Sequence, residues 1–262
     1  MKIMSLNVNQ FQVLKLQEGS WVKEILVLIK VFLYDNPDGV VFLYEIPERF
    51  WKTGDLESAL VPYEVIYSGR GKIFTVAIKS KDNIWIRPTQ DKFSCPAGYE
   101  NRYTELCHQK SEIRVLGIHA PMNGSYDNDG EVFLGAVEAH AKCIDQLIIV
   151  GDFNITTNKW RTKEIEEKLK TTKSQKAIRE CKEFYARQKW LLEAMPSIGY
   201  SDAVQGDPPT YFWKDGRGTT IDHVLVSESL TKNVRRVKVF AQRELELSDH
   251  AAIIVDIQEK IS

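Results

Sequence analysis

The sequence predicts an α/β fold in which two β-sheets pack together and helices cover their outer faces. Three observations support this expectation. Short apolar runs of strand length recur along all 262 residues, helical patterns separate some of them, and no internal repeat or low-complexity linker divides the chain. Strands interspersed with helices form layered α/β structures around a common core. We therefore expect a single domain that spans residues 1–262.

The first half of the chain alternates between strands and one helix. The expected helix runs from about Trp21 to Tyr34, because its apolar residues recur at helical spacing. A turn rich in Asn, Pro, Asp and Gly follows at residues 36–39, and the glycine-rich residues 68–71 predict a hairpin. We expect strands in this half at residues 2–8, 40–44, 63–67 and 73–78.

The second half contains a polar stretch and a long helical region. Residues 88–111 are polar and predict an irregular surface excursion. Helices are expected at about 131–143 and, in one or two pieces, at 159–193. At the end of the second helical region, Trp190, Leu191 and Leu192 are expected to pack into the core. We expect strands in this half at residues 113–118, 147–150, 221–226, 234–240 and 252–257.

Composition excludes several classes of protein. The net charge is −1, so a site for a polyanion has to be a local surface rather than a general basic excess. The first residues lack the pattern of a signal peptide. The most apolar stretch, residues 21–34, contains three charged residues and is too short to span a bilayer, so no transmembrane segment is expected. Four widely spaced cysteines predict free thiols and a cytoplasmic location.

Polar and titratable residues stand at the ends of the predicted strands. Two clusters are the clearest: Gly151-Asp152-Phe153-Asn154 directly follows an apolar run, and Ser248-Asp249-His250 directly precedes one. Each residue alone has a structural explanation as a turn residue, a helix cap or a satisfied core histidine. Together they predict a site that binds a metal ion and a phosphate, because strand ends on one edge of a sheet converge. The set comprises Asn7, Glu45, His119, Asp152, Asn154, Asp222, Asp249 and His250.

The order of these motifs resembles the endonuclease/exonuclease/phosphatase superfamily, which includes pancreatic DNase and the abasic-site endonucleases. The resemblance spans residues 2–257. It implies a four-layer sandwich of two packed mixed β-sheets flanked by helices, and a Mg²⁺-dependent phosphoesterase. The motifs that carry it are Leu6-Asn7-Val8-Asn9, Glu45, Gly151-Asp152-Phe153-Asn154, Thr210-Tyr211-Phe212-Trp213, Ile221-Asp222-His223-Val224-Leu225 and Ser248-Asp249-His250.

The resemblance implies a metal site and a set of catalytic residues that act on the phosphate. A divalent cation, Mg²⁺ or Mn²⁺, neutralises a phosphodiester and stabilises its leaving oxygen. The implied metal ligands are Glu45, Asp249 and Asn7. The implied catalytic residues are Asp152 as the base for the attacking water, Asn154, His250 on the phosphate with Asp222 fixing its ring, and His119 as a second phosphate contact and candidate general acid. The implied substrate-binding residues are Thr210, Trp213 and Arg217.

Two departures from the family pattern affect this assignment. Tyr44 stands where many members have glutamine before the metal glutamate. The segment His119-Ala120-Pro121 looks more like the DNase and phosphatase branches, which often pair this histidine with an acid from the preceding hairpin. Residues 68–72 contain no such acid, so the role of His119 stays open.

Residues 159–189 form a basic segment with eleven Lys or Arg and five Glu. Two interpretations of this segment stay open. It is either a polyanion-facing surface that borders the cleft, or a solvated helix face with charge pairs one turn apart.

The leading hypothesis for the function is a nuclease that hydrolyses DNA or RNA. The second is a phosphatase or phosphodiesterase that acts on a phospholipid, inositol phosphate or nucleotide, because the fold hosts both. The third, a non-catalytic binding protein, is disfavoured because every metal and phosphate position is retained.

Overall fold

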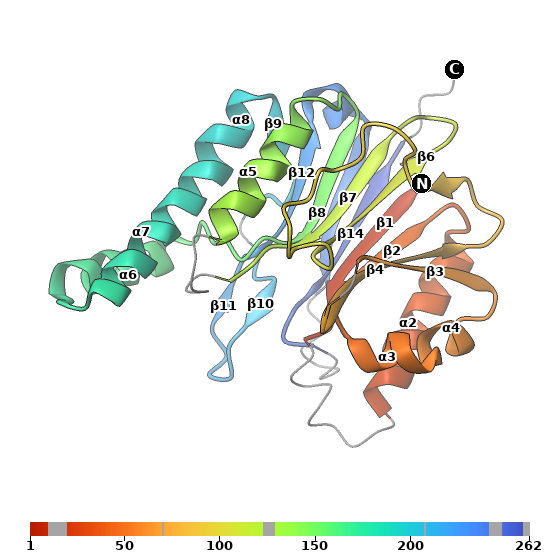
Figure 1. Ribbon diagram of the computed structural model, residues 1–262, viewed down its shortest axis with the longest axis horizontal. Helices are drawn as coiled ribbons and strands as arrows, with labels where there is room; N and C mark the ends of the chain where they lie inside the picture. The colour runs from red at the N-terminus through yellow and green to blue at the C-terminus, as the bar shows by residue number, and fades with distance from the viewer. Residues whose placement is uncertain (10–19, 70, 123–128, 207, 241–247, 259–262) are drawn as a thin grey trace.

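Two six-stranded sheets form the centre of the protein (Figure 1). The computed structural model describes residues 1–9, 20–69, 71–122, 129–206, 208–240 and 248–258. The first sheet has the strand order β13-β14-β1-β2-β4-β3, and only β1 and β2 are parallel. Its strands are β1 (Lys2–Asn7), β2 (Val40–Pro47), β3 (Tyr63–Tyr67), β4 (Ile73–Ser80), β13 (Val234–Phe240) and β14 (Ala252–Ile257).

The second sheet has the order β5-β6-β7-β8-β12-β9, and only β7 and β8 are parallel. Both sheets are therefore mixed, as expected. Its strands are β5 (Trp85–Ile86), β6 (Tyr103–His108), β7 (Arg114–His119), β8 (Leu147–Asp152), β9 (Tyr200–Asp202) and β12 (Asp222–Ser227). A small separate hairpin, β10 (Tyr211–Phe212) and β11 (Gly218–Thr219), precedes β12.

Helices cover the outer face of each sheet. The first sheet is covered by α2 (Ser20–Asp35), with α3 (Glu48–Thr53) and α4 (Asp55–Ala59) beside it. The second is covered by α5 (Asp129–Ala141) and by the turn η1 (Trp190–Ala194) that follows α7. The helices α6 (Lys159–Thr171) and α7 (Gln175–Lys189) extend away from the sandwich on the left of Figure 1. Two short helical elements, α8 (Met195–Ser197) and η2 (Glu228–Asn233), complete the secondary structure.

The core lies in three apolar layers, one between the sheets and one beneath each helical layer. Phe42, Tyr44, Val115 and Val150 belong to the central layer and are fully buried. This arrangement is the four-layer α/β sandwich that the sequence predicts. Among the described residues, no helix is both long and apolar enough to cross a membrane.

Some sequence-based expectations about the fold are wrong. Residues 88–111 are not wholly irregular, because β6 runs through them and pairs with β5 and β7. The charged residue Glu105 made this segment resemble a loop in the sequence, but its side chain is buried in the strand. Its carboxylate accepts a hydrogen bond from the Phe93 amide (3.0 Å) and contacts His140 Nε2 at 2.9 Å. Leu192 is 57% exposed, although its neighbours Trp190 and Leu191 are buried as expected.

Candidate active site

The predicted polar residues meet at one end of the sandwich. Asn7, His119 and Asp152 are the last residues of β1, β7 and β8. Asp222 is the first residue of β12, which runs antiparallel to β8, and it pairs in register with Asp152. Asp249 and His250 directly precede β14, which runs antiparallel to β1. Strand direction therefore brings residues from both sheets to the same edge.

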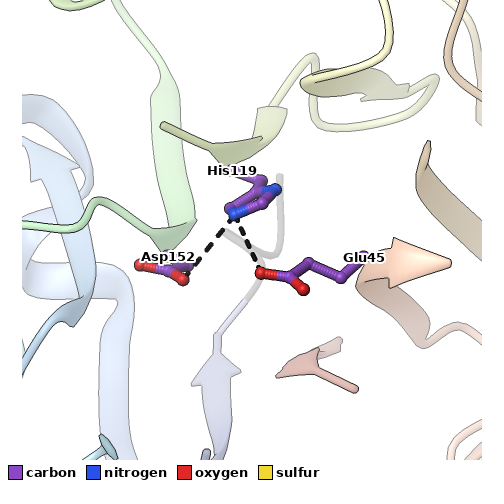
Figure 2. Close-up of side chains that lie close together, drawn as sticks. All are labelled: Glu45, His119 and Asp152. Carbon is purple, nitrogen blue, oxygen red and sulfur yellow. Dashed lines mark ion pairs between the residues drawn. The ribbon is translucent and has the colours of Figure 1, made fainter. Parts of the chain in front are cut away.

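His119 lies between two carboxylates that come from different sheets (Figure 2). Its Nε2 atom is 3.2 Å from Glu45 Oε1 and 3.9 Å from Asp152 Oδ2. All three side chains are largely buried. Asn7 joins the same two carboxylates, because its Nδ2 donates to Glu45 Oε1 (3.2 Å) and to Asp152 Oδ2 (3.0 Å). His119 and Asn7 thus both contact the two carboxylates and hold them close together.

Glu45 occupies a left-handed backbone conformation with φ of 61°. The register of β2 against β4 shifts between Leu43 and Ile46, so Glu45 lies in a bulge of the strand. Such conformations are rare for residues other than glycine and occur often where a strand must redirect a side chain. Burial raises the pKa of Glu45, but the hydrogen bond from His119, the His119 charge and the bond from Asn7 outweigh it and lower this pKa to about 2. Glu45 is therefore a carboxylate at neutral pH.

Asp152 has the opposite electrostatic environment. Burial and repulsion from Asp222 raise its pKa to about 6, although His250, His119 and a backbone hydrogen bond favour the charged form. That bond comes from the Asn154 amide to Asp152 Oδ1 (2.8 Å). Asn154 has φ of 52° and donates its side-chain Nδ2 to Ala120 O (2.8 Å), which fixes the loop after β8 against the loop after β7. A carboxylate with a pKa near neutrality is suited to accept a proton from water.

Asp222 and His250 form a buried pair. His250 Nδ1 lies 2.9 Å from Asp222 Oδ2, and His250 Nε2 lies 3.9 Å from both Asp152 Oδ2 and Asp249 Oδ1. Burial lowers the pKa of His250, but the charge and hydrogen bond of Asp222, with Asp152 and Asp249, raise it to about 10. His250 is therefore an imidazolium at neutral pH. The Tyr211 ring packs edge-on against it, with the centroids 5.1 Å apart.

This edge of the sandwich can be compared with known proteins. A family model described as endonuclease-reverse transcriptase matches residues 115–254, just over half of the chain. The chain belongs to the endonuclease/exonuclease/phosphatase superfamily. No curated protein sequence matches it.

Solved structures share the fold over nearly the whole chain. A 3′ phosphatase from Neisseria bound to a product DNA hairpin has 20% identity and a TM-score of 0.63, covering 98% of this chain and 99% of that one. An AP endonuclease from Leishmania major has 16% identity and a TM-score of 0.66, covering 98% and 87%. A mannosyl-6-phosphatase from Bacteroides thetaiotaomicron has 15% identity and a TM-score of 0.58, covering 98% and 99%.

The divalent metal that the superfamily implies fits the acidic residues of this edge. Among the described residues, potential ligand atoms come together in two groups: Glu45, His119 and Asp152, and Asp152, Asp222 and His250. Asp249 Oδ1 is buried and has no hydrogen-bond partner within the described chain. Its other oxygen accepts from Asn9 Nδ2 (2.6 Å). A buried carboxylate oxygen without a donor favours a cation, and oxygen ligands favour Mg²⁺ or Mn²⁺.

Both ends of the side-chain amide of Asn7, an expected metal ligand, are hydrogen-bonded. Its Oδ1 accepts from the Asn9 amide (2.9 Å), while its Nδ2 faces the carboxylates. A backbone amide can only donate, so this bond fixes which end of the Asn7 side chain is the oxygen. In this arrangement Asn7 holds Glu45 and Asp152 together and presents no oxygen to them.

The structure adds Arg102 to the site, which the sequence did not indicate. Arg102 Nη1 lies 3.0 Å from His119 Nδ1, and the His119 amide donates to Arg102 O (2.8 Å). The same Nη1 atom lies 3.5 Å from His119 Nε2, so the guanidinium contacts both nitrogens of the ring. Burial lowers the pKa of Arg102, opposed by Glu45 and Asp152. Arg102 lies just before β6, inside the stretch expected to be an irregular excursion, so no strand-end pattern marked it.

The three expected substrate-binding residues differ in their surroundings. Thr210 is fully buried, and its Oγ1 accepts from the amides of Ile221 (3.0 Å) and Asp222 (2.9 Å), so it positions the backbone of Asp222. Trp213 is half-buried and Arg217 is exposed at the β10–β11 turn, beside the start of α6.

Tyr44, at the position where many superfamily members have glutamine, connects the two sheets beneath the site. Its hydroxyl accepts from Ser5 Oγ (3.1 Å) in the first sheet and donates to Val150 O (2.9 Å) in the second. Burial raises its pKa far above the usual range, so it stays a neutral phenol. Gly151 leaves room for this ring, since a Cβ there would lie 2.9 Å from it and 2.0 Å from Ile118 O.

Proposed function

We propose that the protein is a metal-dependent phosphoesterase, and most specifically a nuclease that hydrolyses phosphodiester bonds in DNA or RNA. The observation that supports it best is the pairing of two carboxylates with opposite pKa shifts across His119. Glu45 stays charged, as a ligand must, and Asp152 has a pKa near neutrality, as a base needs.

The residues divide the reaction between them. Glu45 and Asp249 would hold Mg²⁺ or Mn²⁺, which supplies charge neutralisation at the phosphate and at the leaving oxygen. Asp152 accepts the proton of the attacking water, and Asn154 holds that water or a phosphate oxygen. His250 donates a hydrogen bond to a phosphate oxygen, because Asp222 keeps it protonated. His119, whose Nε2 faces Glu45 and Asp152, is a second phosphate contact and a candidate general acid.

Nucleic acid is the proposed substrate rather than a small phosphate ester. The family description names an endonuclease, and two of the similar structures carry names of enzymes or products of DNA metabolism. A phosphorylated small molecule or a lipid is the alternative, which the similarity to a mannosyl-6-phosphatase supports. The proposal keeps the cytoplasmic location expected from the cysteine spacing; all four cysteines are free thiols.

The decisive experiment is a substrate panel. The protein is incubated with Mg²⁺ or Mn²⁺ and supercoiled plasmid, abasic duplex, single-stranded RNA, inositol phosphates and sphingomyelin. We expect cleavage of at least one nucleic acid, abolished by EDTA and by Asp152→Asn. Turnover of only an inositol phosphate or the lipid would establish the alternative. Absence of turnover on the whole panel, with metal bound, would favour a binding protein.

A further inference from the structure

Two tryptophans and two arginines pack together at the start of α6. Trp160 and Trp213 are in edge contact, with centroids 5.4 Å apart. The Arg217 guanidinium lies over both rings, 5.4 Å from the centroid of Trp160 and 5.7 Å from that of Trp213. The Arg161 guanidinium lies 5.9 Å from the centroid of Trp213. We call these residues, with Glu164, the arginine shelf. Stacked guanidiniums have a fixed plane and present their donors to the side.

Both arginines point to the same carboxylate. Arg161 Nη1 lies 2.6 Å from Glu164 Oε2, and Arg217 Nη1 lies 3.1 Å from Glu164 Oε1. Each oxygen therefore takes one guanidinium, which is how a phosphate is bound by two arginines. The side chains are 39%, 41% and 57% exposed for Arg161, Glu164 and Arg217. Ion pairs this exposed contribute little stability, so another anion can replace Glu164.

A chain of aromatic contacts joins the arginine shelf to the candidate active site. Tyr211 contacts Trp213 at 5.3 Å and His250 at 5.1 Å between ring centroids. The Phe212 amide donates to Asp249 O (2.8 Å), so the hairpin is also fixed to the residue beside His250. Lys159, Lys163 and Lys214 are exposed and adjacent in sequence to shelf residues. Arg217 Nε also donates to Asp215 Oδ2 (2.9 Å), so the shelf arginines and these three lysines, five cations, face the two carboxylates Glu164 and Asp215. The surroundings therefore carry a net positive charge.

We infer that the arginine shelf is a second phosphate site, for a nucleic-acid strand whose scissile phosphate lies at His250. Glu164 occupies this site in the free protein and is displaced when the strand binds. The inference rests on the proposed function and specifies where the strand leaves the catalytic centre. Tyr211 links the two phosphate positions, because its ring contacts Trp213 on one side and His250 on the other.

The two members of one ion pair should have opposite effects on binding. The probe is a fluorescein-labelled single-stranded oligodeoxynucleotide, measured by anisotropy in EDTA so that no cleavage occurs. Arg217→Ala should weaken binding about tenfold and reduce the log–log salt slope by about 0.7, the value for one lost contact to a single strand. Glu164→Gln should strengthen binding about fivefold, because it removes the competing anion. If the pairs serve only to hold the hairpin to α6, both variants break the same contacts, and Glu164→Gln would weaken binding or leave it unchanged; that result overturns the inference.

A matched control comes from the same helical pair. Lys168 and Glu180 form an ion pair between α6 and α7 (3.1 Å), away from the aromatic residues. Glu180→Gln changes the net charge as Glu164→Gln does, and we expect no gain in oligonucleotide binding. An equal gain from both variants would mean that general charge is responsible, and would overturn the assignment of the site.

Competitors distinguish the sources of phosphate. A longer unlabelled oligonucleotide should displace the probe far better than the same concentration of phosphate present as inorganic phosphate or as phosphatidylserine vesicles. Equal competition by either would overturn the assignment to nucleic acid. Hydrolysis of bis(p-nitrophenyl) phosphate by the wild-type protein with Mn²⁺ tests the proposed function separately. Hydrolysis without the gain from Glu164→Gln defeats only the inference, whereas oligonucleotide binding that responds as expected, without any hydrolysis, defeats only the proposed catalysis.

Discussion

Asp222 and His250 form a hydrogen bond between the two sheets. Asp222 begins β12 in the second sheet, His250 precedes β14 in the first, and their Oδ2 and Nδ1 atoms are 2.9 Å apart. The pair therefore fixes the ring and the charge of the imidazole that we assign to the phosphate.

If this pair acts as a unit, its members should not contribute independently. His250→Ala is expected to lower kcat/KM about 100-fold, and Asp222→Asn to lose much of the same amount, because the ring loses its orientation and its charge. The double variant should be little worse than either. Steady-state kinetics on the best substrate of the panel measures this. Losses that add in log rate would show that the residues act independently.

The raised pKa of Asp152 predicts that catalysis and stability conflict at this residue. Its folded pKa of about 6 exceeds the usual value of 3.8, so the ionised form destabilises the folded state above pH 6, and the penalty disappears below about pH 4. In EDTA, Asp152→Asn should raise the free energy of unfolding by about 3 kcal/mol at pH 7.5 and by almost nothing at pH 3.5. Urea unfolding at both pH values measures the difference. Asp82→Asn, at an exposed aspartate, is the control. An increase in the free energy of unfolding of Asp152→Asn that does not depend on pH would contradict this account.

The carboxylates predict a metal dependence that can be measured without turnover. Mg²⁺ or Mn²⁺ should raise the Tm of the wild-type protein, because a ligand that binds only the folded state stabilises it by about 2.7 kcal/mol at 100 times its Kd. Glu45→Gln should lose most of that shift and most of the activity while remaining folded. Glu48→Gln, at an exposed residue paired with Lys52, should keep both. Full turnover after removal of divalent metal would refute the role of Glu45.

Arg102 should act through His119. Its guanidinium contacts both ring nitrogens, 3.0 Å from Nδ1 and 3.5 Å from Nε2, and so holds the ring in place. Arg102→Met is therefore expected to lower kcat about tenfold with little change in Tm. Arg102→Lys retains a cation and should recover part of the loss. NMR of ¹⁵N-histidine protein should show the His119 ring resonances shifted in Arg102→Met and shifted less in Arg102→Lys. Unchanged His119 resonances in both variants would exclude this positioning role.

The strands could be predicted because their burial makes them continuous apolar runs. The bounds expected for β13 and β14 agree with the structure to the residue, and the polar residues that end β7 and β8 meet as strand direction requires. The superfamily and the layered fold followed from these same elements.

Other features were hidden because their determinants lie far apart in sequence. The strand β6 carries Glu105, whose partners His140 and Phe93 lie on other segments, so it resembled a loop. Glu45 was expected after a strand end, but β2 continues to Pro47 and the residue lies in a bulge. The basic segment contains the ion pairs Arg179–Glu183 and Lys168–Glu180, as expected of a solvated helix face. Its first turn, which includes Arg161, is the part that adjoins Trp213.

The site is divided between the two sheets, so the reaction centre is complete only while the sheets are docked against each other. Asn7 and Glu45 belong to the first sheet and Asp152 and Asp222 to the second, and the Tyr44 hydroxyl is one of the groups that bond to both. Either sheet alone, however well formed, carries half of a reaction centre. Enzymatic rate should therefore report the docking of the sheets: a change that shifts one sheet relative to the other should lower activity even where the strands of each sheet stay intact.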